Sequence, residues 1–347
     1  MGGQAGGIIV KKDKRTKTSL IIPIIIIIII ISLLALTFIS VYGSAPSAGF
    51  SDFGTAKIVS DKQPEVFEDS TINGLYDNDL LNIAFLGFDK SSLERQDILP
   101  RPDTIIITAI DLKTEQVSLV SVPRDSYVNI YGTEIFDKIN HSYMYGYQSA
   151  NVNEDPHAKG IEVTLLTIES FLCGVPINAY FATDMDGVVA IVDKIGGLDF
   201  DVEVAVRSQF GQGNLLLDKG QQHLDGQLLL KYVKNRAFHQ GGEHGRNERQ
   251  QKILIALFKK LNEEGILKNI INLYENLNAY VDTNLKLEQI AALGFLGLKV
   301  NPDEIETYVF NGDGKLSDHN GKKVYYLFID EEDKNSIIEK VFLTKGK

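Results

Sequence analysis

Two segments of the sequence concentrate charged and amide side chains within otherwise apolar surroundings. Segment 121–140 contains SVPRD and DKIN, and segment 234–251 reads KNRAFHQGGEHGRNERQQ. Arginine binds phosphate oxygens through its planar, bidentate guanidinium group. Arginines gathered in a few places of an acidic chain therefore predict a pocket for a phosphorylated ligand.

The most specific local pattern begins at Arg246. The sequence predicts a helix over 247–262 whose apolar stripe is Ile253, Leu254, Leu257 and Phe258. Residues three and four positions apart share a helix face, which extends the stripe back to Arg246, Arg249 and Gln250. A buried arginine is costly without a partner, and a helix N-terminus adds positive charge, so we expect an anion there. A structural network with Glu243 or Glu248 is the alternative.

Carboxylates and further cations follow the predicted strands. Asp89 ends LNIAFLGFD, and Asp103 lies in RPDT, directly before IIITAI. Open α/β sheets bind ligands at such strand ends, and Mg²⁺ takes one or two carboxylates together with substrate phosphates. Ordinary surface charges in a loop are the alternative.

Four further basic residues are predicted to line the pocket, although each is supported by a weaker sequence pattern. Arg124 follows the strand predicted at 117–122, and Lys138 lies in DKIN. Lys234 and Arg236 end a helix predicted over 221–233, where they could reach the same place. For Lys138 the alternative is a solvated loop lysine.

The elements that must position these residues alternate along the chain. Apolar runs predict strands at 81–88, 104–110, 117–122, 178–183, 198–204, 304–310 and 324–328. Helical patterns occupy 164–172, 185–195, 221–233, 247–262 and 287–296, and 150–159 reads as a polar loop. This order predicts one α/β domain over 80–347, with a mixed central sheet flanked by helices.

The N-terminal region predicts a single-pass membrane protein. Residues 1–18 form a basic tail, and 19–42 are uncharged and include an unbroken isoleucine run, Ile24–Ile31. About 20 apolar residues span a bilayer, and basic flanks stay cytoplasmic. We therefore expect a cell-membrane anchor, an extracellular stalk over 43–79 and an extracellular C-terminal domain.

Composition excludes other classes of protein. The formal net charge is −11, whereas nucleic-acid binders show a basic footprint. The single cysteine, Cys173, forms no intrachain disulfide and no zinc cluster. The sequence contains no P-loop and no GxSxG motif.

Taken in order, the motifs resemble those of the LytR–CpsA–Psr family of cell-wall glycopolymer ligases. They are GFD at 87–89, RPDT at 101–104, SVPRD at 121–125, DKIN at 137–140, the stretches 184–202 and 217–236, and HGRNERQQ at 244–251. The resemblance implies a Mg²⁺-dependent phosphotransferase. It would move a teichoic acid, capsule or similar polymer from an undecaprenyl-pyrophosphate carrier to peptidoglycan.

The resemblance also implies roles for individual residues. Asp89 and Asp103 would hold or approach Mg²⁺, and Asp103, Arg124 and Arg246 would be catalytic. The expected pyrophosphate ligands are Arg101, Lys138, Lys234, Arg236, Arg249 and Gln250. Two positions depart from the family pattern, because Lys234 replaces an arginine and Glu243 replaces an aspartate. Lysine keeps the charge but loses the bidentate fork.

Two other functions remain open at this point. A non-catalytic receptor for polyprenyl phosphate or polymer would use the same arginines, but only an enzyme needs both aspartates and the metal. A transcriptional role, suggested by the older naming of the family, is opposed by the acidic composition and by the absence of a helix-turn-helix signal.

Overall fold

The computed structural model describes residues 79–89, 99–207, 215–234, 242–319 and 321–343. The predicted tail, the predicted anchor and all of the predicted stalk except Asp79 lie outside these ranges, as does Arg236. No helix in the described part of the chain combines the length and apolar character needed to cross a membrane.

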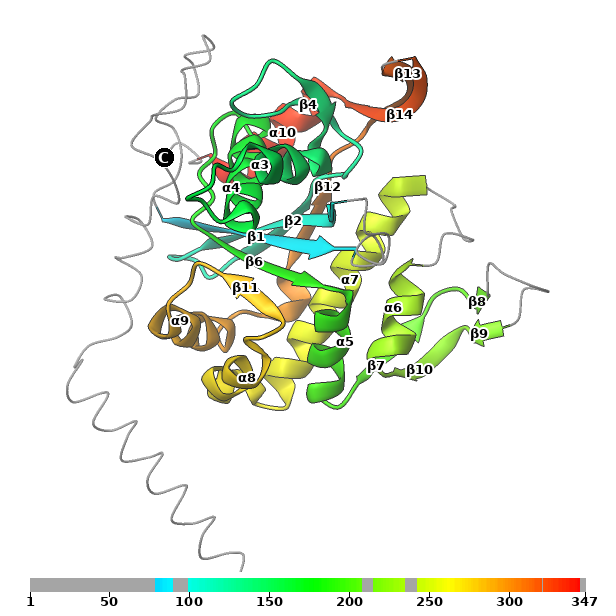
Figure 1. Cartoon of the computed structure of the whole chain (residues 1–347). Coiled ribbons are helices and arrows are strands. Elements are labelled where there is room, and N and C mark those ends of the chain that lie inside the picture. Colours follow the sequence, from blue (N-terminus) through cyan, green and yellow to red (C-terminus); the bar gives the residue numbers. More distant parts are fainter. Residues whose placement is uncertain (1–78, 90–98, 208–214, 235–241, 320, 344–347) are drawn as a thin grey trace, which may run out of the picture. The chain divides into compact units, whose positions relative to one another are not determined.

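A six-stranded mixed sheet forms the centre of the domain and confirms the predicted α/β class (Figure 1). Its order is β11-β6-β1-β2-β3-β12. The strands are β1 (Leu80–Phe88), β2 (Pro102–Asp111), β3 (Val117–Ser121), β6 (Ala179–Asp184), β11 (Val281–Thr283) and β12 (Glu306–Val309). Strands β1 and β2 are buried along most of their length, which explains their near-continuous runs of isoleucine, leucine and alanine.

Strand directions bring the functional motifs to one edge of the sheet. β1 is parallel to β6 and antiparallel to β2, β2 is antiparallel to β3, and β3 is parallel to β12. The carboxyl ends of β1, β3, β6 and β12 therefore meet the beginning of β2. The motifs at 87–89, 101–104 and 121–125 all lie at this edge, where open α/β sheets bind ligands.

Helices cover both faces of the sheet. One apolar cluster joins the sheet to α3 (Ser142–Ser149), α4 (Pro156–Phe171) and α10 (Glu331–Phe342). A second cluster joins its other face to α7 (Gly242–Glu263), α8 (Ile270–Leu277) and α9 (Leu287–Gly297). In α7, Gln251 donates hydrogen bonds to the carbonyls of Leu119 and Tyr308, at 3.0 and 2.8 Å. These bonds fix the N-terminal half of α7 against β3 and β12.

A smaller apolar cluster packs beside the sheet and supports α7 from another side. It is built from α5 (Met185–Lys194), β7 (Leu198–Val202), β8 (Val206–Arg207), β9 (Leu215–Leu217), β10 (Gly220–Leu224) and α6 (Gly226–Lys234). Asp184 caps α5 by accepting a hydrogen bond from the Gly187 amide at 2.9 Å.

Three sequence predictions need correction. Residues 221–224 belong to β10 rather than to a helix, because GQQHL pairs with β7. The predicted loop at 150–159 ends early, since Asp155 caps α4 and Pro156 occupies its first turn. Helix α7 begins at Gly242 rather than at 247, so its first turn precedes the predicted start.

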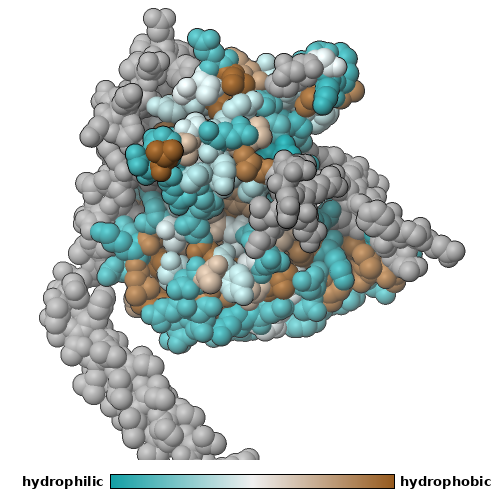
Figure 2. Space-filling model, in the orientation of Figure 1, coloured by the Kyte–Doolittle hydropathy of each residue, from teal (hydrophilic) through white to brown (hydrophobic). Residues whose placement is uncertain are grey.

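Two hairpins complete the site-bearing edge. Strands β4 (Tyr127–Asn129) and β5 (Phe136–Lys138) form one, and β13 (Gly312–His319) and β14 (Lys322–Ile329) form the other. The β13–β14 hairpin, at the upper right of Figure 1, carries apolar and polar atoms side by side in Figure 2. Sequence reasoning predicted β14 but missed β13, whose residues GDGKLSDH are mostly polar.

Candidate active site

A β-bulge places Asp103 at the centre of the site. Gly87 pairs with Thr104, but Phe88 pairs with Pro102, so Asp103 is the extra residue between them. Bulges turn a side chain out of the regular alternation and are frequent near active sites. Gly87 permits the close approach, since a Cβ there would lie 3.1 Å from the Thr104 Cβ.

Three side chains from separate elements converge on Asp103. The Arg124 guanidinium forms an ion pair with its carboxylate. Asn140 Nδ2 lies 3.4 Å from the other carboxylate oxygen. Arg246 donates to the backbone carbonyl of Asp103 at 3.1 Å and is 7% exposed. The structure thus brings Asp103, Arg124 and Arg246 together although they are far apart in the sequence.

Asp137 anchors one side of the site. It is 3% exposed and accepts hydrogen bonds from the Lys138 amide at 2.8 Å, the Tyr326 hydroxyl at 3.1 Å and the Tyr145 hydroxyl at 3.2 Å. His141 Nδ1 lies 2.7 Å from its second oxygen. Burial alone would raise the Asp137 pKa, but the bonds from His141, Lys138 and Tyr326 outweigh it and lower the pKa to about 2.

This carboxylate sets the orientation of Arg101. The Arg101 guanidinium lies 2.5 Å from His141 Nε2. Arginine has no acceptor, so Nε2 must accept and Nδ1 must carry the proton that it donates to Asp137. Asp137 therefore fixes the tautomer of His141, and His141 fixes Arg101. Sequence reasoning did not single out Asp137, although it begins the DKIN motif.

Lys138 and Lys234 both contact carboxylates. Lys138 Nζ lies 2.6 Å from Asp125 Oδ1, and Arg124 Nε lies 3.6 Å from Asp125 Oδ2. Lys234 Nζ lies 3.7 Å from Asp89 Oδ1 and 2.8 Å from the Met185 sulfur. Asp125, which sequence reasoning gave no role, therefore orients both Arg124 and Lys138.

The polar residues of α7 separate onto two sides. Gln250 is buried beside Arg246 on the helix, and its Oε1 has no hydrogen-bond partner among the described residues. Arg249 instead lies over the Tyr232 ring of α6, at 5.3 Å from the ring centroid. Gln250 and Arg249, which were both predicted to bind pyrophosphate, therefore lie in different surroundings.

Asp89 and Asp103 are suited to supply two carboxylate ligands to a hard cation whose other ligands are water and substrate. They follow Phe88 and Pro102, which are register partners on adjacent strands. The described residues contain no group of three histidine, cysteine or carboxylate side chains placed to hold a metal. Two carboxylates match Mg²⁺ bound also by water and substrate phosphates. Such an ion would share Asp103 with Arg124.

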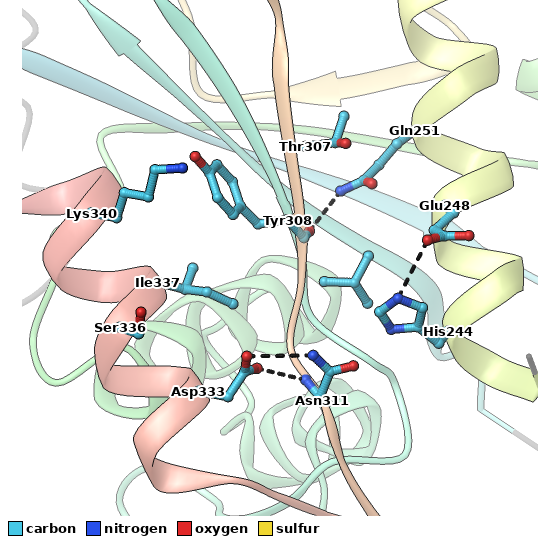
Figure 3. A pocket seen from close by; sticks show the side chains of 11 residues that line it. His244, Glu248, Gln251, Thr307, Tyr308, Asn311, Asp333, Ser336, Ile337 and Lys340 are labelled. Carbon is cyan, nitrogen blue, oxygen red and sulfur yellow. Dashed lines mark hydrogen bonds and ion pairs between the residues drawn. The ribbon is translucent and has the colours of Figure 1, made fainter.

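A polar pocket of about 340 Å³ lies on another side of α7 (Figure 3). It is lined by His244, Glu248, Gln251, Thr307, Tyr308, Val309, Asn311, Asp333, Ser336, Ile337 and Lys340. None of the predicted site residues that the structure describes lines this pocket. His244 contacts Glu248 at 3.4 Å, and Asp333 accepts from the Asn311 amide N–H at 2.9 Å.

Comparison with known proteins identifies the family. The model of the LytR_cpsA_psr family matches residues 51–342. The chain belongs to this family. A teichoic acid transferase of Oceanobacillus iheyensis, named polyisoprenyl-teichoic acid–peptidoglycan teichoic acid transferase TagU, is 30% identical over 77% of this chain and 77% of its own length.

Solved structures of the LytR_cpsA_psr type share the fold. The crystal structure of B. subtilis TagV matches with a TM-score of 0.60 and 26% identity, covering 76% of this chain and 95% of that one. A structure titled TagT bound to LIIa-WTA matches with a TM-score of 0.57 and 22% identity, over 81% of this chain and 94% of that one. At that identity, the second match supports the fold alone.

Proposed function

We propose that this chain is a phosphotransferase that attaches a secondary wall polymer, of the teichoic acid type, to peptidoglycan. The donor would be the polymer linked to undecaprenyl pyrophosphate. The observation that carries the proposal is the convergence of Arg124 and Arg246 on Asp103, at the edge where the sheet places ligands. The name of the TagU relative supports this substrate class.

The reaction needs positioning and charge neutralisation rather than a covalent enzyme intermediate. The oxygen of an acceptor sugar hydroxyl attacks the phosphorus that carries the polymer. The bond from that phosphorus to the polyprenyl phosphate breaks, and polyprenyl phosphate leaves with the electron pair. The hydroxyl proton is released, and the polymer becomes joined to peptidoglycan through a phosphodiester.

Arg124 and Arg246 would bind the oxygens of the pyrophosphate, where bidentate donors give both charge and geometry. Arg101, which His141 and Asp137 hold in place, would bind from the side of β2. Lys234 and Arg236 would extend the positive surface, and Gln250 would donate a side-chain amide.

Asp89 and Asp103 would hold Mg²⁺. When bound, the ion would neutralise charge on the transferring phosphoryl group. Because Arg124 already contacts Asp103, the arginine and the metal would meet the same phosphate. We also propose that the basic tail is cytoplasmic, that 19–42 crosses the cell membrane and that the catalytic domain lies outside.

Transfer by the purified full-length protein tests this function. The assay supplies undecaprenyl-pyrophosphate-linked polymer and a peptidoglycan glycan, with Mg²⁺ or with a chelator. Release of polyprenyl phosphate together with a polymer–glycan product, lost on chelation, is the expected result. Donor binding without product under any metal condition would favour the alternative of a non-catalytic receptor that regulates wall assembly.

A further inference from the structure

One face of the β4–β5 hairpin leads from the candidate active site onto two exposed aromatic rings. Side chains alternate along a strand, and cross-strand partners share a face. Tyr127, Phe136 and Lys138 therefore lie on one face of this hairpin, while the buried Asp137 lies on the other. Phe136 is 51% exposed and stands two residues from Lys138, roughly 7 Å along the strand. A ligand bound beside Lys138 can extend onto the rings.

Neighbouring aromatic residues hold the two rings in place. The rings of Tyr127 and Phe136 stack, with centroids 5.6 Å apart and an interplanar angle of 29°. Tyr127 also meets the Tyr326 ring edge-on at 5.1 Å and the Phe328 ring at 4.9 Å. Both of these rings come from β14, which lies beside β4 in Figure 1. Tyr127 is thus packed on several sides, and Phe136 has the more exposed ring.

A fixed and exposed aromatic ring beside a phosphate site is suited to bind a sugar. One face of a pyranose ring presents C–H groups, which are apolar and weakly positive, whereas the face of an aromatic ring is negative, so the two stack. A ring that is already held in place loses little conformational freedom when a ligand binds. A single exposed phenylalanine is ordinary on a protein surface, but Phe136 belongs to a stack that adjoins the proposed active site.

The charges around the rings favour the acceptor glycan over the donor polymer. A polymer of the teichoic acid type carries a phosphate in each repeat, whereas the backbone of a peptidoglycan glycan consists of uncharged N-acetylated amino sugars. Lys138 and Lys315 lie over rings of β14, and both have carboxylate neighbours. These are Asp125 at 2.6 Å and Asp313 at 3.7 Å, and the exposed Glu134 adds negative charge in the loop of the hairpin. A chain of phosphates would meet a carboxylate beside each of these lysines.

We propose that Phe136, supported by Tyr127, is the stacking platform for a sugar of the acceptor glycan. The stacked sugar would be a neighbour of the one whose hydroxyl attacks, and the glycan would run along the exposed face of the hairpin from Lys138 toward Phe136. The inference rests on the proposed function, because it locates the second substrate of that reaction. Phe136 would determine acceptor specificity without touching the reacting phosphorus.

The absence of tryptophan from the chain permits an optical test of this contact. Phe136→Trp keeps an aromatic face and introduces a single reporter. Phe295→Trp is the matched control, since Phe295 is 50% exposed on α9, which covers the other face of the sheet from α10. Each full-length variant in detergent is titrated with a peptide-free peptidoglycan glycan fragment and, separately, with a lipid-free glycerol phosphate polymer.

We expect the glycan fragment to change the emission of the Phe136→Trp variant and to leave the control unchanged. The glycerol phosphate polymer should have the smaller effect on the Phe136→Trp emission. A response to the polymer that equals or exceeds the response to the glycan would assign the rings to the donor and overturn the inference. An absent response, or an equal response from the control, would overturn it as well.

Transfer kinetics test whether the contact serves the reaction. Phe136→Ala should raise the KM for the acceptor glycan by roughly tenfold, within the range for losing an aromatic stacking partner. The kcat and the KM for the donor should change by less than about twofold, because the lost contact holds the acceptor equally in the ground state and the transition state. Phe136→Leu keeps the apolar bulk and should resemble Phe136→Ala, whereas Phe136→Trp should stay near the wild type. Rescue by leucine, or a rise in the donor KM instead, would contradict the platform.

The platform and the proposed function fail in different ways. Normal transfer with an acceptor KM that Phe136→Ala leaves unchanged would refute the platform and leave the enzyme intact. A response of the Phe136→Trp reporter to the glycan, without transfer under any metal condition, would support the platform and favour a receptor over the enzyme.

Discussion

Helix α7 presents polar groups to two regions that differ in how their charges are balanced. On one side, Arg246 reaches the backbone carbonyl of Asp103, next to the ion pair of Arg124. On the other side, in the pocket of Figure 3, His244 pairs with Glu248. Lys340, which also lines this pocket, lies 3.9 Å from Glu306 outside the lining. In the first region Arg124, Lys138 and Lys234 contact carboxylates, whereas Arg101 contacts the His141 imidazole. In the second region His244 and Lys340 both have carboxylate neighbours.

This difference shows that a cavity is a weaker sign of function than the arrangement of charge. In the pocket of Figure 3, Glu248 contacts His244 and Asp333 accepts a hydrogen bond from Asn311, so both carboxylates already have partners within the lining. Such contacts suit a structural role. At the strand ends, Arg101 contacts the His141 imidazole rather than a carboxylate, so its charge remains available to an anion.

The largest effect should come from the arginines of the first region. Arg124→Ala and Arg246→Ala should each reduce transfer by about 100-fold or more, because they remove preorganised charge from the transferring phosphate. Binding of a polyprenyl pyrophosphate should weaken by about 1–3 kcal/mol. Steady-state transfer and calorimetric binding measure the two quantities. Arg207→Ala, at an exposed position in β8, is the control, and an equal loss there would indicate general destabilisation.

Removing one carboxylate charge should separate catalysis from binding. Asp103→Asn keeps the shape of the bulge but weakens the contact with Arg124 and the proposed metal site. Transfer should fall by about 100-fold, the scale for losing an electrostatic contact to the transition state. Donor binding, measured by calorimetry, should persist. Wild-type transfer by this variant would refute the metal role of Asp103, and full rescue of a deletion strain would favour the receptor.

A smaller effect should follow from the residue behind Arg101. Asp137→Asn should reduce transfer by roughly tenfold, the lower range for groups that orient a direct ligand. It should also destabilise the fold by on the order of 2 kcal/mol at pH 7, because the Asp137 pKa of about 2 lies below the ordinary 3.8. Since the folded pKa is depressed, this stabilisation is present above pH 4 and is lost as pH falls through about 2. Urea unfolding at pH 7 and pH 3 measures it, and a pH-independent difference would contradict the assignment.

The smallest effect should come from the second region. Glu248→Gln removes an exposed pair with His244, so the free energy of unfolding should change by less than about 1 kcal/mol. Transfer should stay within twofold of the wild type. A loss comparable to that of Arg246→Ala would show that the pocket of Figure 3 participates in the reaction, and the contrast between the two sides of α7 would then disappear.

Sequence patterns predicted the sheet better than its surroundings. Strands β1, β2 and β3 are dense in buried isoleucine, leucine and valine, a signal that depends only on local composition. Strand β10 was missed because GQQHL becomes a strand through its pairing with β7, which tertiary structure decides. The family resemblance implied catalytic roles for Asp103, Arg124 and Arg246, and the structure brings these three residues together.

The finer arrangement of the site was beyond sequence reasoning. The bulge at Asp103 depends on how β1 and β2 pair. The apolar pattern of the two strands does not reveal that one extra residue lies between two paired positions. Asp137 accepts hydrogen bonds from several elements, because the hydroxyls of Tyr145 in α3 and Tyr326 in β14 both reach it. Arg249, three residues from Arg246, lies against Tyr232 because helix α6 packs there.

The two halves of the site depend on contacts of different range along the chain. Asp89 and Asp103 flank one antiparallel strand pair, whose two strands are close in the sequence. The contact from Arg246 to Asp103 spans 143 residues and forms only when α7 docks on the sheet. A domain with an intact sheet can therefore lack a working site. Local opening of the first turns of α7 would switch activity off well below the melting temperature, and amide hydrogen exchange would detect it there before it reaches β1.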